Sequence, residues 1–132
     1  MHIYIDENLS ENVAAALNSL SKGYFNDVTV HSTKLEFGKG VSDEELIPKI
    51  GEQNGYLITR DFQIQKTKFQ FDLLKNNGVG AFFIKLPKNM NKHWELVKLL
   101  VNNWETIIES VRSGKKPFAY RIQNRGKMEK LN

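Results

Sequence analysis

The sequence predicts an α/β protein with a mostly parallel central sheet of about five strands, flanked by helices in a three-layer α/β/α arrangement. Two observations predict this fold. Short apolar runs alternate along the chain with stretches whose apolar residues recur at helical spacing. The segments follow one another in the order β-α-β-α-β-α-β-α-β, which favours parallel strands joined by crossover helices. The length of 132 residues suits one domain, so we expect residues 1–132 to form a single unit.

Five short segments have the composition of buried strands. They are rich in β-branched, aromatic and other apolar residues, and turn residues or charged residues bound them. The expected strands cover residues 2–5, 28–31, 56–59, 79–84 and 118–122. The segment 79–84 is apolar throughout, as expected for a strand that helices cover on both faces.

Four segments predict helices, over residues 11–20, from 43 to about 53, over 68–76 and over 91–111. Ser10 is the expected N-cap of the first, and Ser42 with Glu45 fits a capping box at the start of the second. Pro48 should kink the second helix or weaken one turn. The third helix should turn Phe69 and Leu73 inward, with Phe71 as a further candidate. The fourth is expected to be one continuous amphipathic helix with seven inward residues, namely Trp94, Val97, Leu100, Val101, Trp104, Ile107 and Ile108.

The composition excludes several classes of site. The chain has no cysteine, which rules out disulfides, thiolate metal sites and a cysteine nucleophile, and makes the cytoplasm the expected location. No stretch is long and apolar enough to span a bilayer, and the start of the chain lacks the pattern of a signal peptide. Residues 36–40 contain two glycines and predict a loop.

Charge is distributed unevenly along the chain. Residues 1–59 hold nine acids and four Lys or Arg, a net charge of −5, whereas residues 60–132 hold six acids and fifteen Lys or Arg, a net charge of +9. This asymmetry suggests an acidic site beside a basic surface, and nucleic acid fits such a surface because Lys and Arg neutralise phosphates. Solvated surface lysines are the alternative explanation.

Three aspartates are expected at one edge of the sheet. Asp6 ends the first strand, Asp61 follows the third, and Asp43 begins a helix that runs back against the strands. The carboxyl ends of parallel strands share one edge, where ligands usually bind. Each aspartate alone also has a structural explanation, as a turn residue or as a helix-terminal acid favoured by the dipole.

Clustered carboxylates repel one another, and a divalent cation removes the repulsion. Oxygen ligands favour hard ions, so Mg²⁺ or Mn²⁺ is the expected metal. Such an ion activates water and stabilises charge on a phosphodiester during attack. The sequence is equally compatible with one ion or two.

The stretches IDENLS, SDEELIPKIGEQNGYLITRD and GVGAFFI resemble the PIN-like ribonuclease domains, particularly the short VapC-type toxin branch. The block from the DEE of 43–45 to the TRD of 59–61 is the most specific part. The late tryptophan-containing helix and the RGK of 125–127 are also similar to that branch. One family feature is not evident, because residues 20–40 are too short for the helix that carries a further acid.

The resemblance implies a metal-dependent endoribonuclease, the toxin of a toxin–antitoxin pair, with RNA as substrate and an antitoxin protein as partner. It maps the metal-binding acids onto Asp6, Asp43 and Asp61, with Thr59 supporting the site. Glu7 and Glu44 are weaker candidates for metal ligands. Six basic residues are expected to contact RNA, the last three from a basic terminal strand and tail over about 115–132: Arg60, Lys66, Lys68, Arg121, Arg125 and Lys127.

Alternative explanations remain for the basic residues and for the function. A solvated turn and a mobile terminus would also account for the basic residues. The missing acid is compatible with a non-catalytic PIN-like module that binds RNA or protein, and the amphipathic segments are compatible with a homodimer. A phosphoacceptor receiver domain is a third hypothesis, since Asp6 and Glu7 form an acidic pair and Lys85 lies two residues before a proline. His31 is expected to be structural.

Overall fold

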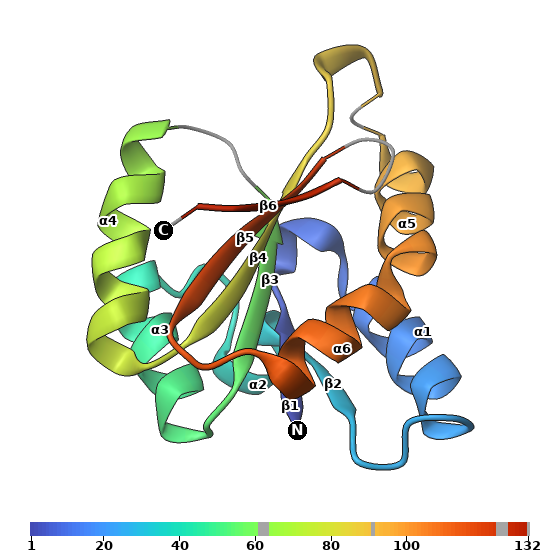
Figure 1. Cartoon of the computed structure of the whole chain (residues 1–132), viewed down its shortest axis with the longest axis horizontal. Coiled ribbons are helices and arrows are strands. Elements are labelled where there is room, and N and C mark those ends of the chain that lie inside the picture. The colour runs from blue at the N-terminus through green and yellow to red at the C-terminus, as the bar shows by residue number, and fades with distance from the viewer. Residues whose placement is uncertain (61–63, 91, 124–126, 132) are drawn as a thin grey trace.

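The computed structural model describes residues 1–60, 64–90, 92–123 and 127–131 (Figure 1). Six strands are described: β1 (His2–Ile5), β2 (Thr29–Ser32), β3 (Tyr56–Arg60), β4 (Gly80–Lys85), β5 (Phe118–Gln123) and β6 (Met128–Lys130). The helices are α1 (Glu11–Lys22), α2 (Thr33–Phe37), α3 (Asp43–Glu52), α4 (Ile64–Asn77), α5 (His93–Asn102) and α6 (Trp104–Ser113), with 3₁₀ turns η1 (Glu7–Leu9) and η2 (Lys88–Met90).

The strands form one sheet in the order β2-β1-β3-β4-β5-β6. Strands β1 to β5 are parallel, which confirms the predicted mostly parallel α/β sheet. Strand β6 is antiparallel to β5. The sequence does not predict this second terminal strand, since the tail that contains it was expected to be basic and, in the alternative explanation, mobile. The segment joins the sheet because the edge of β5 offers unpaired backbone groups, and the Leu131 N–H donates to the Ala119 carbonyl at 2.9 Å.

Two apolar layers cover the two faces of the sheet. Ile3, Ile5, Ile58 and Phe82 pack with residues of α1, α5 and α6 on one face. Tyr4, Leu57, Ala81 and Phe83 pack with residues of α3 and α4 on the other. Figure 1 shows α3 and α4 on the opposite side of the sheet from α1, α5 and α6. Alternate residues of the central strands thus enter different layers, which is why the middle of β1, β3 and β4 is buried and almost entirely apolar.

The prediction of one continuous helix over 91–111 is wrong. The chain forms α5 and α6 with Asn103 between them, where the Asn103 side chain donates to the Leu99 carbonyl at 2.8 Å. Trp104 is buried and its indole N–H donates to the Ser21 hydroxyl of α1 at 2.8 Å. The change of direction brings Trp104 onto α1, whereas Trp94 and Val101, predicted to face inward, are 67% and 48% exposed.

Three local expectations also need correction. Phe69 is 49% exposed, whereas Leu74 is buried and Leu73 packs, partly buried, against the same apolar layer; the helix also begins at Ile64, earlier than predicted. The short helix α2, capped by the Ser32 hydroxyl, was not predicted and includes Glu36 and Phe37 at the start of the predicted loop, whereas residues 38–40 are non-helical as expected. The Ser42 hydroxyl makes no capping hydrogen bond to α3, although the acids of the first turn are favourably placed for the helix dipole.

Replacing Gly80 with Ala should destabilise the protein. A Cβ at Gly80 would lie 2.5 Å from a ring atom of Phe118, which is buried between Tyr56 and Phe82 and cannot move freely. We expect the free energy of unfolding, measured by urea denaturation, to fall by about 1–3 kcal/mol.

Gly23→Ala is the matched control, because a Cβ there meets no atom within 4 Å and the backbone φ of −78° suits alanine. Its free energy of unfolding should stay near that of the wild type. Equal stability of the two variants would contradict the packing argument.

Candidate functional site

The candidate site lies where β1 and β3 end side by side at the carboxyl edge of the sheet. After β1 the chain moves outward to β2, and after β2 it crosses back to β3 on the other side of β1. This reversal is the topological switch point of an open parallel sheet, and ligands of such sheets usually bind outside the strand ends at that point. Asp6 directly follows β1, and Thr59 and Arg60 are the last residues of β3.

Asp6 is held in one orientation by three hydrogen bonds. Its backbone N–H donates to the Ile58 carbonyl at 2.9 Å, which extends the pairing of β1 with β3. Its carboxylate accepts from the Thr59 hydroxyl at 2.7 Å and from the Glu7 backbone N–H at 2.9 Å. Thr59 itself is 3% exposed, so this support is buried. The structure therefore brings together two of the predicted site residues.

Burial raises the pKa of the Asp6 carboxyl above its ordinary value. The hydrogen bonds from Thr59 and Glu7 partly offset this effect, whereas the charges of Asp43 and Glu7 add to it. Among the described groups that act on it, neutral donors stabilise the ionised form and neighbouring carboxylates oppose it. A cation near Asp6 would act in the opposite direction, by stabilising the ionised form.

Asp43 is the first residue of α3, and its charge acts on Asp6. Its carboxylate accepts a hydrogen bond from the Gln70 side chain at 2.9 Å. Gln70 lies on α4 and was not predicted as a site residue. A lone glutamine in a helix carries no recognisable signal, because its contact with Asp43 depends on how α3 and α4 pack.

The carboxylate of Glu7, a weaker candidate for a metal ligand, is hydrogen-bonded to the backbone. It accepts from the Gly40 backbone N–H, at 3.1 and 3.2 Å to its two oxygens. Gly38 and Gly40 have φ values of +99° and +75°, a conformation that favours glycine. Glu7 thereby holds the turn that leads into α3 and Asp43. Glu44, the other weaker candidate, is exposed in the first turn of α3.

The structure describes some of the predicted RNA-binding residues. Arg60 is half-buried at the end of β3, and burial lowers its pKa. Lys68 on α4 and Lys127 before β6 are exposed, whereas Arg121 on β5 lies 3.9 Å from the Glu129 carboxylate of β6. Asp61, Arg125 and the side chain of Lys66 lie outside the described residues.

The donor chemistry of the site fits a hard divalent cation. Asp6, Asp43 and Thr59 offer oxygen atoms, which Mg²⁺ and Mn²⁺ prefer. Within the described ranges there is no group of three His, Cys, Asp or Glu side chains placed to hold a metal ion. The third predicted aspartate, Asp61, is not among those residues. Asp6 and Asp43 would therefore be the described part of such a site.

The described helices do not have the character of membrane spans. None of them combines the length and the apolar character that crossing a bilayer requires.

In metal-free protein, the Asp6 carboxyl should titrate above the ordinary aspartate value of 3.8, and Thr59→Val should raise its pKa further. The substitution removes the hydroxyl donor with little change of shape, so the ionised carboxylate loses support. Titration of the carboxyl carbon by NMR checks both statements. An unchanged pKa in Thr59→Val would contradict the assigned role of the hydroxyl.

The raised pKa has a consequence for stability. Because the folded state binds the Asp6 proton more tightly than the unfolded state, the contribution of Asp6 to stability is lost as pH rises through its folded pKa. In EDTA, the free energy of unfolding of the wild type should therefore fall relative to that of Asp6→Asn as pH rises above about 4. Urea denaturation over a pH series measures the difference, and a relative rise would contradict the shift.

Comparison with known proteins gives one match. No curated protein and no solved structure matches the chain. A family model described as "PIN like domain" matches residues 1–86, from β1 to the end of β4, a segment that includes Asp6, Asp43 and Thr59. The match covers well over half of the chain and agrees with the resemblance of the sequence to PIN-like domains. The chain therefore belongs to the PIN-like domain family.

Proposed function

We propose that this protein is a divalent-metal-dependent endoribonuclease whose site is built on Asp6, Asp43 and Asp61. The observation that carries the proposal is the half-buried Asp6 carboxylate, held by Thr59 and influenced by Asp43, at the switch point of a PIN-like sheet. PIN domains are generally nucleases, and they typically use divalent metals. A partly buried carboxylate whose pKa is perturbed by burial and by neighbouring charges is a frequent mark of a functional site.

Each residue has a definable task in this proposal. Asp6, Asp43 and Asp61 would hold Mg²⁺ or Mn²⁺, which when bound supplies water activation and charge stabilisation at the phosphodiester. Thr59 holds the Asp6 carboxylate in place by donating to it, and Gln70 does the same for the Asp43 carboxylate. Such outer supports matter because they orient ligand oxygens before the ion binds.

The carboxyl edge also carries basic residues suited to an RNA backbone. Arg60 ends β3, and the exposed Lys85 ends β4. The exposed Lys88 follows in η2, in the segment that projects beyond this edge in Figure 1. Strand β5 ends at the same edge, and the exposed Lys127 closes its connection to β6. Phosphate contacts from these residues would place the RNA strand over the acids.

The toxin role is the finer part of the proposal. It rests on the similarity of the DEE-to-TRD block and of the late tryptophan-containing segment to the VapC-type branch. A cognate antitoxin would then cover the carboxyl edge and block access to Asp6. Such a partner, like a homodimer, could be detected by co-purification and by measuring the mass of the complex in solution.

A non-catalytic PIN-like module that binds RNA or protein is the second candidate. Glu7 favours it, because its carboxylate already accepts from Gly40, which leaves fewer acids free to hold a metal. In that case RNA binding would persist in EDTA, fall steeply with salt and produce no cleavage. The nuclease requires cleavage that depends on the divalent ion.

Asp6→Asn and Asp61→Asn should each abolish RNA cleavage and Mn²⁺ binding in folded protein, because each removes one charged oxygen ligand. Calorimetric Mn²⁺ titration, followed by cleavage of a mixed RNA substrate, measures both effects. Asp72→Asn, an exposed position on α4, is the matched control and should retain both. Full cleavage by a folded Asp6→Asn variant would overturn the nuclease proposal.

Gln70→Ala should weaken Mn²⁺ binding by about tenfold, because the Asp43 carboxylate loses its orienting donor. Cleavage should recover when the Mn²⁺ concentration is raised, since no ligand has been removed. Gln53→Ala, an exposed glutamine after α3, serves as the control and should bind Mn²⁺ like the wild type. Equal affinity of all three proteins would exclude a positioning role for Gln70.

A further inference from the structure

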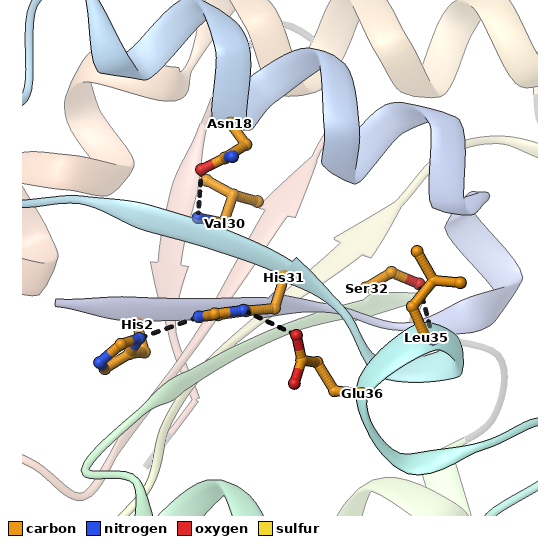
Figure 2. A network of polar contacts seen from close by, with 7 residues as sticks. All are labelled: His2, Asn18, Val30, His31, Ser32, Leu35 and Glu36. Atoms are coloured by element: carbon orange, nitrogen blue, oxygen red, sulfur yellow. Dashed lines mark hydrogen bonds and ion pairs between the residues drawn. The ribbon is translucent and has the colours of Figure 1, made fainter.

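Two of the three histidines of the chain meet at the edge of the sheet, away from the acidic site. His2 begins β1, His31 lies on β2, and Glu36 on α2 completes the group. The Nδ1 atom of His2 lies 2.9 Å from Nε2 of His31, and Nδ1 of His31 lies 3.2 Å from the Glu36 carboxylate. Figure 2 shows the three side chains in a line. Asp6 is four residues further along the same strand, about 13 Å away.

The Glu36 carboxylate determines which nitrogen of His31 carries the proton. A carboxylate only accepts, so Nδ1–H of His31 donates to Glu36, and the lone pair of Nε2 faces His2. This arrangement is the carboxylate–histidine pair that orients imidazole ligands in metal sites, where the carboxylate also raises the basicity of the ligand nitrogen.

The His31 ring is held firmly in place. It stacks on Tyr4 with ring centroids 4.7 Å apart, and Tyr4 stacks in turn on Phe37 of α2. Strand β2 is attached to α1 because the Val30 N–H donates to the Asn18 side chain, also drawn in Figure 2. The His31 side chain is only 18% exposed, whereas His2 is exposed. One ligand is therefore fixed, and the other can adjust from the solvent side.

We propose that His2 Nδ1 and His31 Nε2 form a chelating site for a transition-metal ion that prefers imidazole, such as Ni²⁺ or Cu²⁺, with Glu36 as positioning residue and water completing the coordination. Two nitrogens about 2.0–2.1 Å from an ion and at right angles are about 2.9 Å apart, which matches the observed distance. Right angles suit the tetragonal geometry of Cu²⁺ and Ni²⁺. For the tetrahedral angle of Zn²⁺, the two nitrogens would need to be about 3.3 Å apart.

Binding requires a shift of tautomer at His2 and a tilt of the rings, since both lone pairs must turn from the N···N line towards an ion beside it, and the exposed His2 ring has room for this movement. Without metal, Nδ1–H of His2 donates to His31; with metal, that proton resides on the exposed Nε2 and Nδ1 offers its lone pair. The net charge of the two rings does not change. Burial, His31 and the N-terminal amine lower the pKa of His2, and Glu36 raises it, so the neutral form needed for coordination is favoured. The soft-to-borderline nitrogen donors distinguish this site from the oxygen site at Asp6.

The test is a Ni²⁺ titration of protein without any affinity tag, by calorimetry and by thermal unfolding. We expect one Ni²⁺ per chain and an unfolding temperature that rises with Ni²⁺ concentration, because the ion links β1 to β2. His2→Asn should abolish both effects without unfolding the chain, since His2 is exposed. Glu36→Gln should weaken binding about tenfold. His93→Asn, the remaining histidine, and Asp6→Asn should bind Ni²⁺ like the wild type.

Three outcomes would overturn the proposal. Stoichiometric binding that survives His31→Asn would assign the ion to the N-terminal amine and His2 alone. An absence of Ni²⁺ and Cu²⁺ binding in folded wild type would show that the histidines form only a hydrogen-bonded contact. Excess Mg²⁺ should not displace the bound Ni²⁺, and displacement would indicate that the ion sits at the acidic site instead.

Discussion

The register between β1 and β3 is the constraint on which the site depends. Ile5 lies opposite Ile58, and the Asp6 N–H continues the ladder to the Ile58 carbonyl, so that Asp6 comes level with Thr59. A shift by one residue would exchange the two faces of the strand and turn Asp6 away from Thr59. The register is strongly specified, because Ile3 and Ile5 must enter one apolar layer while Tyr4 enters the other.

The same constraint explains why the protein can partly bury the Asp6 carboxylate although burial raises its pKa. Thr59 and the first turn after β1 supply donors, but neither supplies a positive charge. The resulting cost to stability is offset by the two apolar layers around β1 and β3. Conflicts of this kind between local stability and placement are typical of functional sites.

The helices around the edge contribute by fixing the partners of the acids. The turn from Gly38 to Gly40 is held by Glu7, and α4 presents Gln70 to Asp43. Basic residues at the ends of β3 and β4 and beyond β5 lie along the same edge, since parallel strands all end there. The acidic first half and the basic second half of the sequence therefore meet at one surface. The opposite end of β1 carries a separate polar group of histidines.

The sequence by itself determined the α/β class, the five parallel strands and the expectation that Asp6 and Asp43 share an edge. These features depend on local periodicity and on the common direction of parallel strands. The tertiary structure alone decided the break at Asn103, because it serves the bond between Trp104 and Ser21, 83 positions apart. It also decided the pairing of Gln70 with Asp43 and the addition of β6. Each of these contacts joins groups that no local pattern relates, so only the packing of the whole chain could select them.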